Sequence, residues 1–190
     1  MNLTTLNPAT LVLIVGLVLA IGIALWMYVQ KERTHKLRSK FGPEYDKAIA
    51  GHRDRWHAES ELQKRALRVA KFNIQPLKAE DRSRYAEDWR REQSRFVDDP
   101  RVAVNHADTL VQDVMKCRGY PVDNFDQNAI DLSVDHPRVV ENYRTAHEIA
   151  LREGQGVADT EDLRKAMVSY RTLFEDLLVE TVEKPEEVRK

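Results

Sequence analysis

The feature that most constrains this chain is an uninterrupted apolar stretch near its N-terminus, residues 9–29. The stretch reads ATLVLIVGLVLAIGIALWMYV and contains no charged side chain. At about 1.5 Å per residue it makes a helix of roughly 31 Å, and the hydrocarbon core of a bilayer is about 30 Å thick. A helix also satisfies its own backbone hydrogen bonds in lipid. The sequence therefore predicts a transmembrane helix, with Asn7 as its N-cap and Pro8 in its first turn.

Two other interpretations, a cleaved signal peptide and a buried soluble helix, fit this stretch less well. A signal peptide needs a positive n-region, a shorter apolar run and a small-residue cleavage site. Residues 1–8 carry no Lys or Arg. The apolar run ends in LWMYVQKER, which contains no A-x-A cleavage site. A soluble helix of this length normally has one polar face. The sequence thus favours a membrane anchor, preceded by a short external N-terminus at residues 1–8.

The charges on either side of the stretch predict its orientation. Residues 30–42 form a basic juxtamembrane stalk that contains one acidic side chain, Glu32, and the basic residues Lys31, Arg33, Lys36, Arg38 and Lys40. Because basic flanks remain on the inner side of a membrane, the stalk and all that follows are expected in the cytoplasm. No helix breaker precedes Gly42, so the membrane helix is expected to continue through the stalk.

Composition limits what the rest of the chain can be. Roughly 150 residues remain, which is the size of one domain. Across residues 41–190 acidic side chains outnumber basic ones by 30 to 25, so no nucleic-acid partner is expected, because phosphate contacts need clustered Lys and Arg. The single cysteine, Cys117, cannot form an internal disulfide and suits a reducing compartment.

The remaining sequence shows helical rather than alternating periodicity. The expected helices cover residues 44–72, with a split at Gly51 left open, and residues 79–97, 100–118, 137–154 and 161–182. Residues 120–134 read as turns with room for one helical turn, and the short connection near Pro76 predicts an antiparallel hairpin. The predicted fold is all-α: one transmembrane helix and about five soluble helices in a domain at 43–182, followed by a charged tail at 183–190.

Local chemistry predicts several helix ends and several buried residues. A carboxylate or hydroxyl at the N-cap accepts first-turn N–H groups, and proline fits the first turn. The expected N-caps are Asp99, Asp135 and Asp159 or Thr160. If Asp135 caps a helix, the His136 ring points outward. Apolar stripes place three further residues in the core: Trp89, His147 as a core histidine, and Cys117, which burial would make unreactive.

The sequence contains no constellation that would predict catalysis. His52 and His57 are five positions apart, whereas ligands on one helix face are three or four apart. There is no HExxH, no Cys-x-x-Cys and no glycine-rich phosphate loop; these are the patterns of common metal and nucleotide sites. We therefore predict no catalytic residue, no metal site and no cofactor, and favour a protein that is not an enzyme.

Two sets of residues are candidates for recognition. The loops at residues 118–121 and 132–137 combine aromatic and polar groups, and loops often carry binding residues. The candidate recognition residues there are Arg118, Tyr120, Asp135 and His136. The simpler interpretation is preferred: Gly119 ends a helix, Asp135 begins the next, and Tyr120 covers the core edge.

In the anchor, small residues recur every four positions and form a candidate dimer face: Gly16, Ala20 and Ala24.

Several motifs of the soluble part also support a resemblance. They are FGPEYD (41–46), RFVDDP (95–100), RGYP (118–121), LSVDHP (132–137) and VVENYR (139–144). This ordered set resembles a family of uncharacterised bacterial proteins with an N-terminal membrane segment, and it covers most of the soluble domain. The resemblance implies a setting at the bacterial inner membrane. It implies no activity, no cofactor and no catalytic residue.

Two classes of function follow. The leading hypothesis is a membrane-tethered helical interaction module at the cytoplasmic face, with another protein as partner and a homodimer formed through the anchor as a further option. The alternative is a membrane-tethered enzyme that uses His136, Asp135 and Tyr120, or a small-ligand sensor. A pocket with convergent polar groups would favour the alternative. A solid core with an exposed apolar patch would favour the interaction module.

Overall fold

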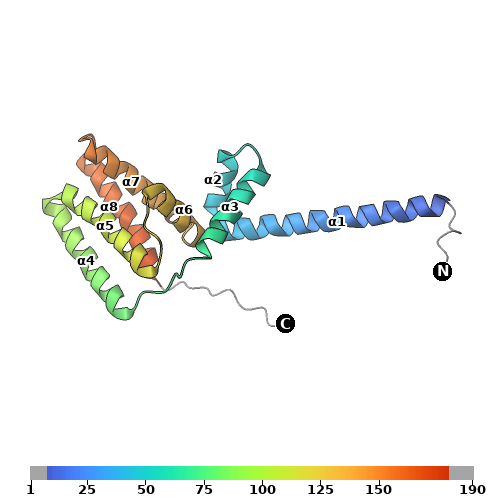
Figure 1. Ribbon diagram of the computed structural model, residues 1–190. Coiled ribbons are helices and arrows are strands. Elements are labelled where there is room, and N and C mark those ends of the chain that lie inside the picture. The colour runs from blue at the N-terminus through green and yellow to red at the C-terminus, as the bar shows by residue number, and fades with distance from the viewer. Residues whose placement is uncertain (1–7, 180–190) are drawn as a thin grey trace.

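The computed structural model describes residues 8–179, and these residues form helices without any strand (Figure 1). The helices are α1 (Pro8–Phe41), α2 (Pro43–Gly51), α3 (Arg55–Val69), α4 (Ala79–Asp98), α5 (Pro100–Arg118), α6 (Phe125–Asp135), α7 (Val140–Gly154) and α8 (Thr160–Leu178). The all-α prediction is confirmed. Seven helices follow α1 in this range, rather than about five. The predicted Asn7 cap and the charged tail lie outside the described residues.

Helix α1 is one continuous helix that projects away from the rest of the chain (Figure 1). Its 34 residues include both the apolar stretch and the basic stalk, as expected from the absence of a helix breaker before Gly42. Its length and apolar composition are sufficient to cross a membrane. The last residue, Phe41, is fully buried in a small core with residues of α2, α3 and α6, so the end of α1 is part of the folded domain.

Helices α2 and α3 pack against the end of α1. Gly42 turns the chain with φ at 45°, and α2 then ends at Gly51 as the sequence allowed. Asp54 begins α3 by accepting a hydrogen bond from the backbone N–H of His57. The predicted hairpin of this segment with the next helix is wrong: α3 packs on α1, α2 and α6, whereas α4 packs along α5. The linker between α3 and α4 passes the end of α5 instead of reversing tightly. Its Gln75 N–H donates to the Arg118 carbonyl at 2.8 Å.

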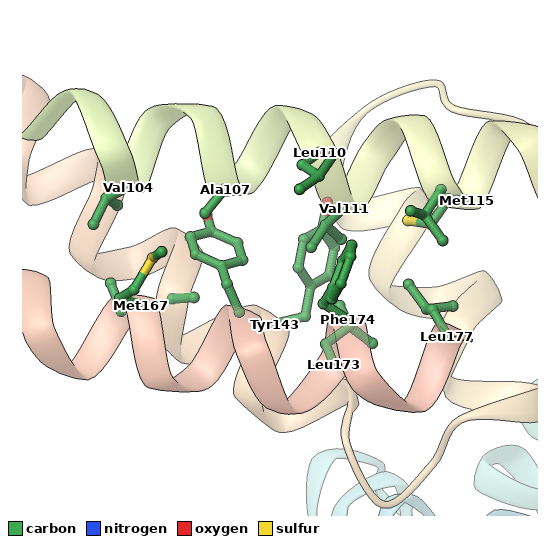
Figure 2. Packing of buried hydrophobic residues seen from close by; sticks show 14 of the residues in the cluster. Val104, Ala107, Leu110, Val111, Met115, Tyr143, Met167, Leu173, Phe174 and Leu177 are labelled. Atoms are coloured by element: carbon green, nitrogen blue, oxygen red, sulfur yellow. The ribbon is translucent and has the colours of Figure 1, made fainter. Parts of the chain in front are cut away.

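The main bundle consists of α4, α5, α7 and α8 (Figure 1). Apolar side chains of α5 face those of α8, and Tyr143 of α7 lies between them (Figure 2). Trp89 is buried as predicted, and its ring stacks on Phe174 with a centroid distance of 4.6 Å. The predicted caps Asp99 and Asp159 are also confirmed, because each accepts a backbone N–H in the first turn of its helix.

Two local predictions need correction. Residues expected to be turn-like form the 11-residue helix α6, which Asn124 caps by accepting from Gln127 N–H. Its buried face is short and interrupted by polar residues, so periodicity alone did not reveal it. Cys117 is exposed, not buried. The buried stripe of α5 runs from Val111 through Met115 to Arg118, so Arg118 occupies the position that the prediction gave to Cys117.

Candidate functional site

An open cleft lies where the end of α1 meets the bundle. Its volume is about 1060 Å³, and its walls come from the basic part of α1, the end of α3, the α5–α6 connection, the α6–α7 turn and the end of α8. We call it the stalk cleft. All four candidate recognition residues contribute to its walls: Arg118, Tyr120, Asp135 and His136. The structure thus brings the two candidate loops together, while their role in recognition stays a prediction.

Gly119 fixes the first of these loops. It adopts a left-handed conformation with φ at 96° directly after α5, which favours glycine. A Cβ atom on this residue would lie only 2.4 Å from the carbonyl oxygen of Asn73. The absence of a side chain therefore lets the α3–α4 linker approach closely. The predicted role of Gly119 as the end of its helix is confirmed.

Tyr120 and Asp135 connect the two loops. The Tyr120 hydroxyl donates to Asp135 Oδ2 at 2.8 Å, and its ring is buried as expected for a residue that covers the core edge. Burial, and then the nearby Asp135 carboxylate, raise the pKa of Tyr120 well above its ordinary value. Tyr120 is therefore a neutral hydrogen-bond donor at physiological pH.

The predicted capping role of Asp135 is wrong. Asp135 is the last residue of α6, and α7 begins later, at Val140, without a side-chain cap. A short turn separates the two helices, in which the His136 carbonyl accepts from the N–H groups of Val139 and Val140. The Asp135 carboxylate instead accepts from Tyr120 across the cleft wall.

His136 was predicted to point outward, and this is also wrong. The residue is only 3% exposed, and its Nδ1 lies 2.5 Å from Asp176 Oδ2 in the last turn of α8. A carboxylate only accepts, so Nδ1 carries a proton and donates to Asp176, and Nε2 is the other nitrogen of the ring. Within residues 8–179 that Nε2 atom has no hydrogen-bond partner, and it is closed to solvent. The Asp176 carboxylate thus orients the His136 ring, but Nε2 is enclosed by the protein.

Asp176 is the residue of this site that the sequence analysis missed. It lies 40 positions from His136, on a helix where charged residues alternate with the apolar stripe. Nothing in its local sequence distinguishes it from a carboxylate on a solvated helix face. Only the packing of α8 beside the α6–α7 turn reveals the pair.

Arg118 also holds the end of α8. Its side chain is buried, and Nη1 donates to the Leu177 carbonyl at 2.8 Å. A cation at the C-terminal end of a helix satisfies a carbonyl that lacks an intrahelical partner and complements the helix dipole. Arg118, at the end of α5, and His136, in the α6–α7 turn, thus both bind the last turn of α8, which gives the inner wall of the cleft a structural role.

A second polar cluster joins α2 to α7. Arg144 contacts both carboxylate oxygens of the buried Glu44, at 2.6 and 2.9 Å. Glu141 accepts from Lys47 at 2.5 Å and from Arg144 at 3.0 Å. Lys47, followed by Arg144, holds the pKa of Glu141 below its ordinary value. This cluster connects the segments 41–46 and 139–144 and fastens α2 to the main bundle.

His147 shows a further difference from expectation. It is half-buried, and its ring stacks on Phe125 at a centroid distance of 3.6 Å, at the edge of the core where α6 meets α7. Among the described residues, no group of three His, Cys, Asp or Glu side chains could hold a metal ion.

Comparisons with known proteins add no family to this description. No protein-family model matches the chain, and no similar curated protein or solved structure was found.

Proposed function

We propose that this chain is a single-pass protein of the bacterial inner membrane whose cytoplasmic helical domain is a protein-interaction module. The observation that carries the proposal is the surface of α1. Every large apolar side chain between Leu11 and Val29 is at least 49% exposed. An apolar surface of this extent on all sides of a helix must be covered, and lipid is the cover that its length fits.

The orientation rests on the basic stalk. Its lysines and arginines are exposed around the part of α1 that follows the apolar stretch, and basic flanks favour the cytoplasmic side. Fusions of alkaline phosphatase and of green fluorescent protein to the C-terminus test this orientation. The phosphatase is expected to be silent and the fluorescent protein bright. The opposite pair of results would place the domain outside the cytoplasm.

The partner surface is assigned to the end of the bundle farthest from α1. The α4–α5 turn and the α7–α8 connection meet there (Figure 1), and Arg101 of α5 pairs with Glu153 of α7 at 3.2 Å. Four exposed apolar residues occupy this end, which we call the distal patch: Val97, Val102, Leu151 and Val157. Exposed apolar surface is typical of interaction sites, and these four residues come from the ends and connections of neighbouring helices.

Photocrosslinking in living cells tests the interaction module. A benzoylphenylalanine at Val97 or Val157 is expected to give adducts of discrete mass with a partner protein. Leu67 is the matched control, because it is equally apolar and is 61% exposed on α3. Adducts at the distal patch but not at Leu67 would support the proposal. Absence of adducts at every position, or the same adducts at all of them, would contradict it.

The stalk cleft supports a second candidate, a membrane-tethered enzyme or small-ligand sensor. The supporting observation is the convergence of the His136–Asp176 and Tyr120–Asp135 pairs on one cleft. Pockets with a few convergent polar groups are typical ligand sites. A His136→Ala or Asp176→Asn variant that melts like the parent protein but fails in a complementation assay would favour this candidate. Normal complementation by both variants would count against it.

A further inference from the structure

We propose that the turn between α2 and α3 rests on the anionic surface of the same membrane that α1 crosses, with Trp56 in the headgroup layer. The inference rests on the proposed anchoring of α1. Together with the first three residues of α3 the turn comprises residues 52–57, HRDRWH, and we call this segment the interfacial turn. It would give the domain a second point of contact with lipid and thereby fix its orientation relative to the bilayer.

The exposure of Trp56 is the first observation. This side chain is 67% exposed, in contrast to the buried Trp89. Its ring approaches the neighbouring His57 edge-on, with centroids 5.0 Å apart. The large apolar ring therefore lies on the surface of the domain. Tryptophan side chains of membrane proteins gather at the headgroup level, where the ring contacts lipid and the N–H stays hydrated.

The height of the turn above the membrane is the second observation. Glu59 in the second turn of α3 accepts a hydrogen bond from Thr34 of α1 at 2.8 Å and another from Tyr45. Thr34 follows Val29, the end of the apolar stretch, by only about 7.5 Å along the helix axis. The headgroup layer extends about 5–8 Å beyond the hydrocarbon core on each side. Glu59 is therefore held at the outer edge of that layer.

The direction of α3 brings Trp56 closer still. Helix α3 crosses α1 obliquely, and it begins on the side that leads toward the N-terminus of α1 (Figure 1). Trp56 is the second residue of α3 and precedes Glu59 by almost one helical turn, so it belongs to this starting end of the helix. The two hydrogen bonds of Glu59 keep this arrangement in place.

Charge is the third observation. Arg53 and Arg55 are both exposed beside Trp56. The one acidic residue of the turn, Asp54, is engaged with α3: it accepts from the backbone N–H and the Nδ1 of His57, at 2.9 and 2.7 Å. The turn therefore presents cations and an aromatic ring to its surroundings, at the same level as the basic stalk. Basic groups next to a bilayer are attracted by anionic lipids, so the expected occupant is the anionic bilayer surface.

Fluorescence quenching in lipid vesicles tests the inference on the full chain. The exposed Cys117 is replaced by serine, and single cysteines are labelled with an environment-sensitive dye at Gly51, Leu19 or Val97. Gly51 ends α2 beside the interfacial turn, and a Cβ atom there meets nothing within 4 Å. The vesicles contain phosphatidylglycerol and a lipid with a nitroxide in its headgroup region, in its upper acyl chain or, to quench the Leu19 dye, deep in its acyl chain. The dye at Gly51 is expected to shift to the blue and lose fluorescence, whereas the dye at Val97 should do neither.

Leu19, in the middle of the apolar stretch, separates the two proposals. If the Leu19 dye is quenched by deep nitroxides but the Gly51 dye behaves like the Val97 dye, the interfacial turn does not touch lipid and the inference is overturned, while the anchor stands. If the Leu19 dye is not quenched, the anchor itself fails and the inference falls with it.

Substitutions in the turn provide the specific controls. Replacing Arg53 and Arg55 together by glutamate should abolish the loss of fluorescence at Gly51. The same charge change at Arg164 and Lys165 of α8 should leave it unchanged. Trp56→Ala should weaken the effect and Trp56→Tyr should retain it, because tyrosine also favours the headgroup layer. If the glutamate substitutions at Arg53 and Arg55 and those at Arg164 and Lys165 had equal effects, a specific contact of this turn with the membrane would be overturned.

Discussion

Gly119 shows how the absence of a side chain allows two segments to pack closely. We expect Gly119→Ala to destabilise the protein by about 3 kcal/mol, because strained backbone costs of order 1–3 kcal/mol and the new Cβ would also meet the Asn73 carbonyl. Gly156→Ala is the matched control, because Gly156 also has a positive φ, at 71°, and has open space around its Cβ. It should cost only about 1–2 kcal/mol. Chemical unfolding of both variants measures the difference, and equal costs would show that the linker can move away.

Trp89 carries the clearest prediction for the core. Trp89→Ala should lower the free energy of unfolding by about 3–5 kcal/mol, because the ring is buried and stacks on Phe174. Trp56→Ala, measured in detergent, should change it by no more than about 0.5 kcal/mol. Thermal unfolding followed by circular dichroism compares the two. A parental melting temperature for the Trp89 variant would show that the core tolerates the cavity.

Residue roles could be predicted where the deciding partner is local. Asp99 and Asp159 cap helices as expected because the N–H group that each accepts from is three residues away. His136 could not be predicted in the same way, since its partner Asp176 is 40 positions distant. Cys117 was misplaced by one position on its helix, because Arg118 takes the buried position with its charge bound to a helix end.

At the scale of elements, α1 offers a direct test of self-association. Gly16, Ala20 and Ala24 form the candidate dimer face of this helix, and small residues let two helices approach closely in lipid. Gly16→Ile and Ala20→Ile are expected to weaken dimerisation in a membrane reporter assay. Val18→Ile, away from these three residues, should leave the reporter signal unchanged. A signal that none of the three substitutions alters would indicate that α1 does not dimerise through this face.

Long apolar or strongly periodic helices were predictable, and short mixed ones were not. Helices α1, α4, α5 and α8 contain long apolar stretches or stripes, so their positions follow from spacing, and Asp99 and Asp159 also cap α5 and α8. Helix α6 does not: its sequence DQNAID resembles a turn, and it becomes a helix because Asn124 caps it and because neighbouring helices cover Ala129 and Leu132. The pairing of α3 with α1 rather than α4 likewise depends on contacts that no local pattern contains.

At the scale of the whole molecule, the cluster between α2 and α7 predicts a dependence of stability on pH. The folded protein holds the pKa of Glu141 below its ordinary value of 4.5. The unfolded chain therefore takes up the proton at a higher pH, and the stabilisation is present above pH 4.5 and lost as the pH falls below it. Glu141→Gln should lower stability at pH 7 and reduce the loss between pH 5 and pH 3.

Glu148→Gln is the control for this prediction, because Glu148 is exposed on the same helix. The midpoint of urea unfolding, measured from pH 7 to pH 3, compares both variants with the parent protein. We expect the Glu148 variant to follow the parental profile. A Glu141 variant with that same profile would show that its pair with Lys47 adds nothing to stability.

The sequence predicted which residues belong to the candidate site, but not how their side chains are arranged. The motifs indicated that residues 118–121 and 132–137 combine aromatic and polar groups, and the structure places both on the stalk cleft. The pairing of Tyr120 with Asp135, and of His136 with α8, depends on how distant helices pack. The third wall of the cleft is the basic part of α1, whose sequence had indicated only a topology signal.

The contact between α2 and α7 also has a consequence for biosynthesis. Glu44 and its partner Arg144 are separated by 100 positions, and Val134 completes the core around Phe41. A ribosome adds about 5–20 residues per second, so the newly made α2 waits about 5–20 s for the residues that cover it. During that interval the apolar surface of Phe41 and Tyr45 is open to chaperones, and folding of the first soluble helices can finish only after Arg144 has been made.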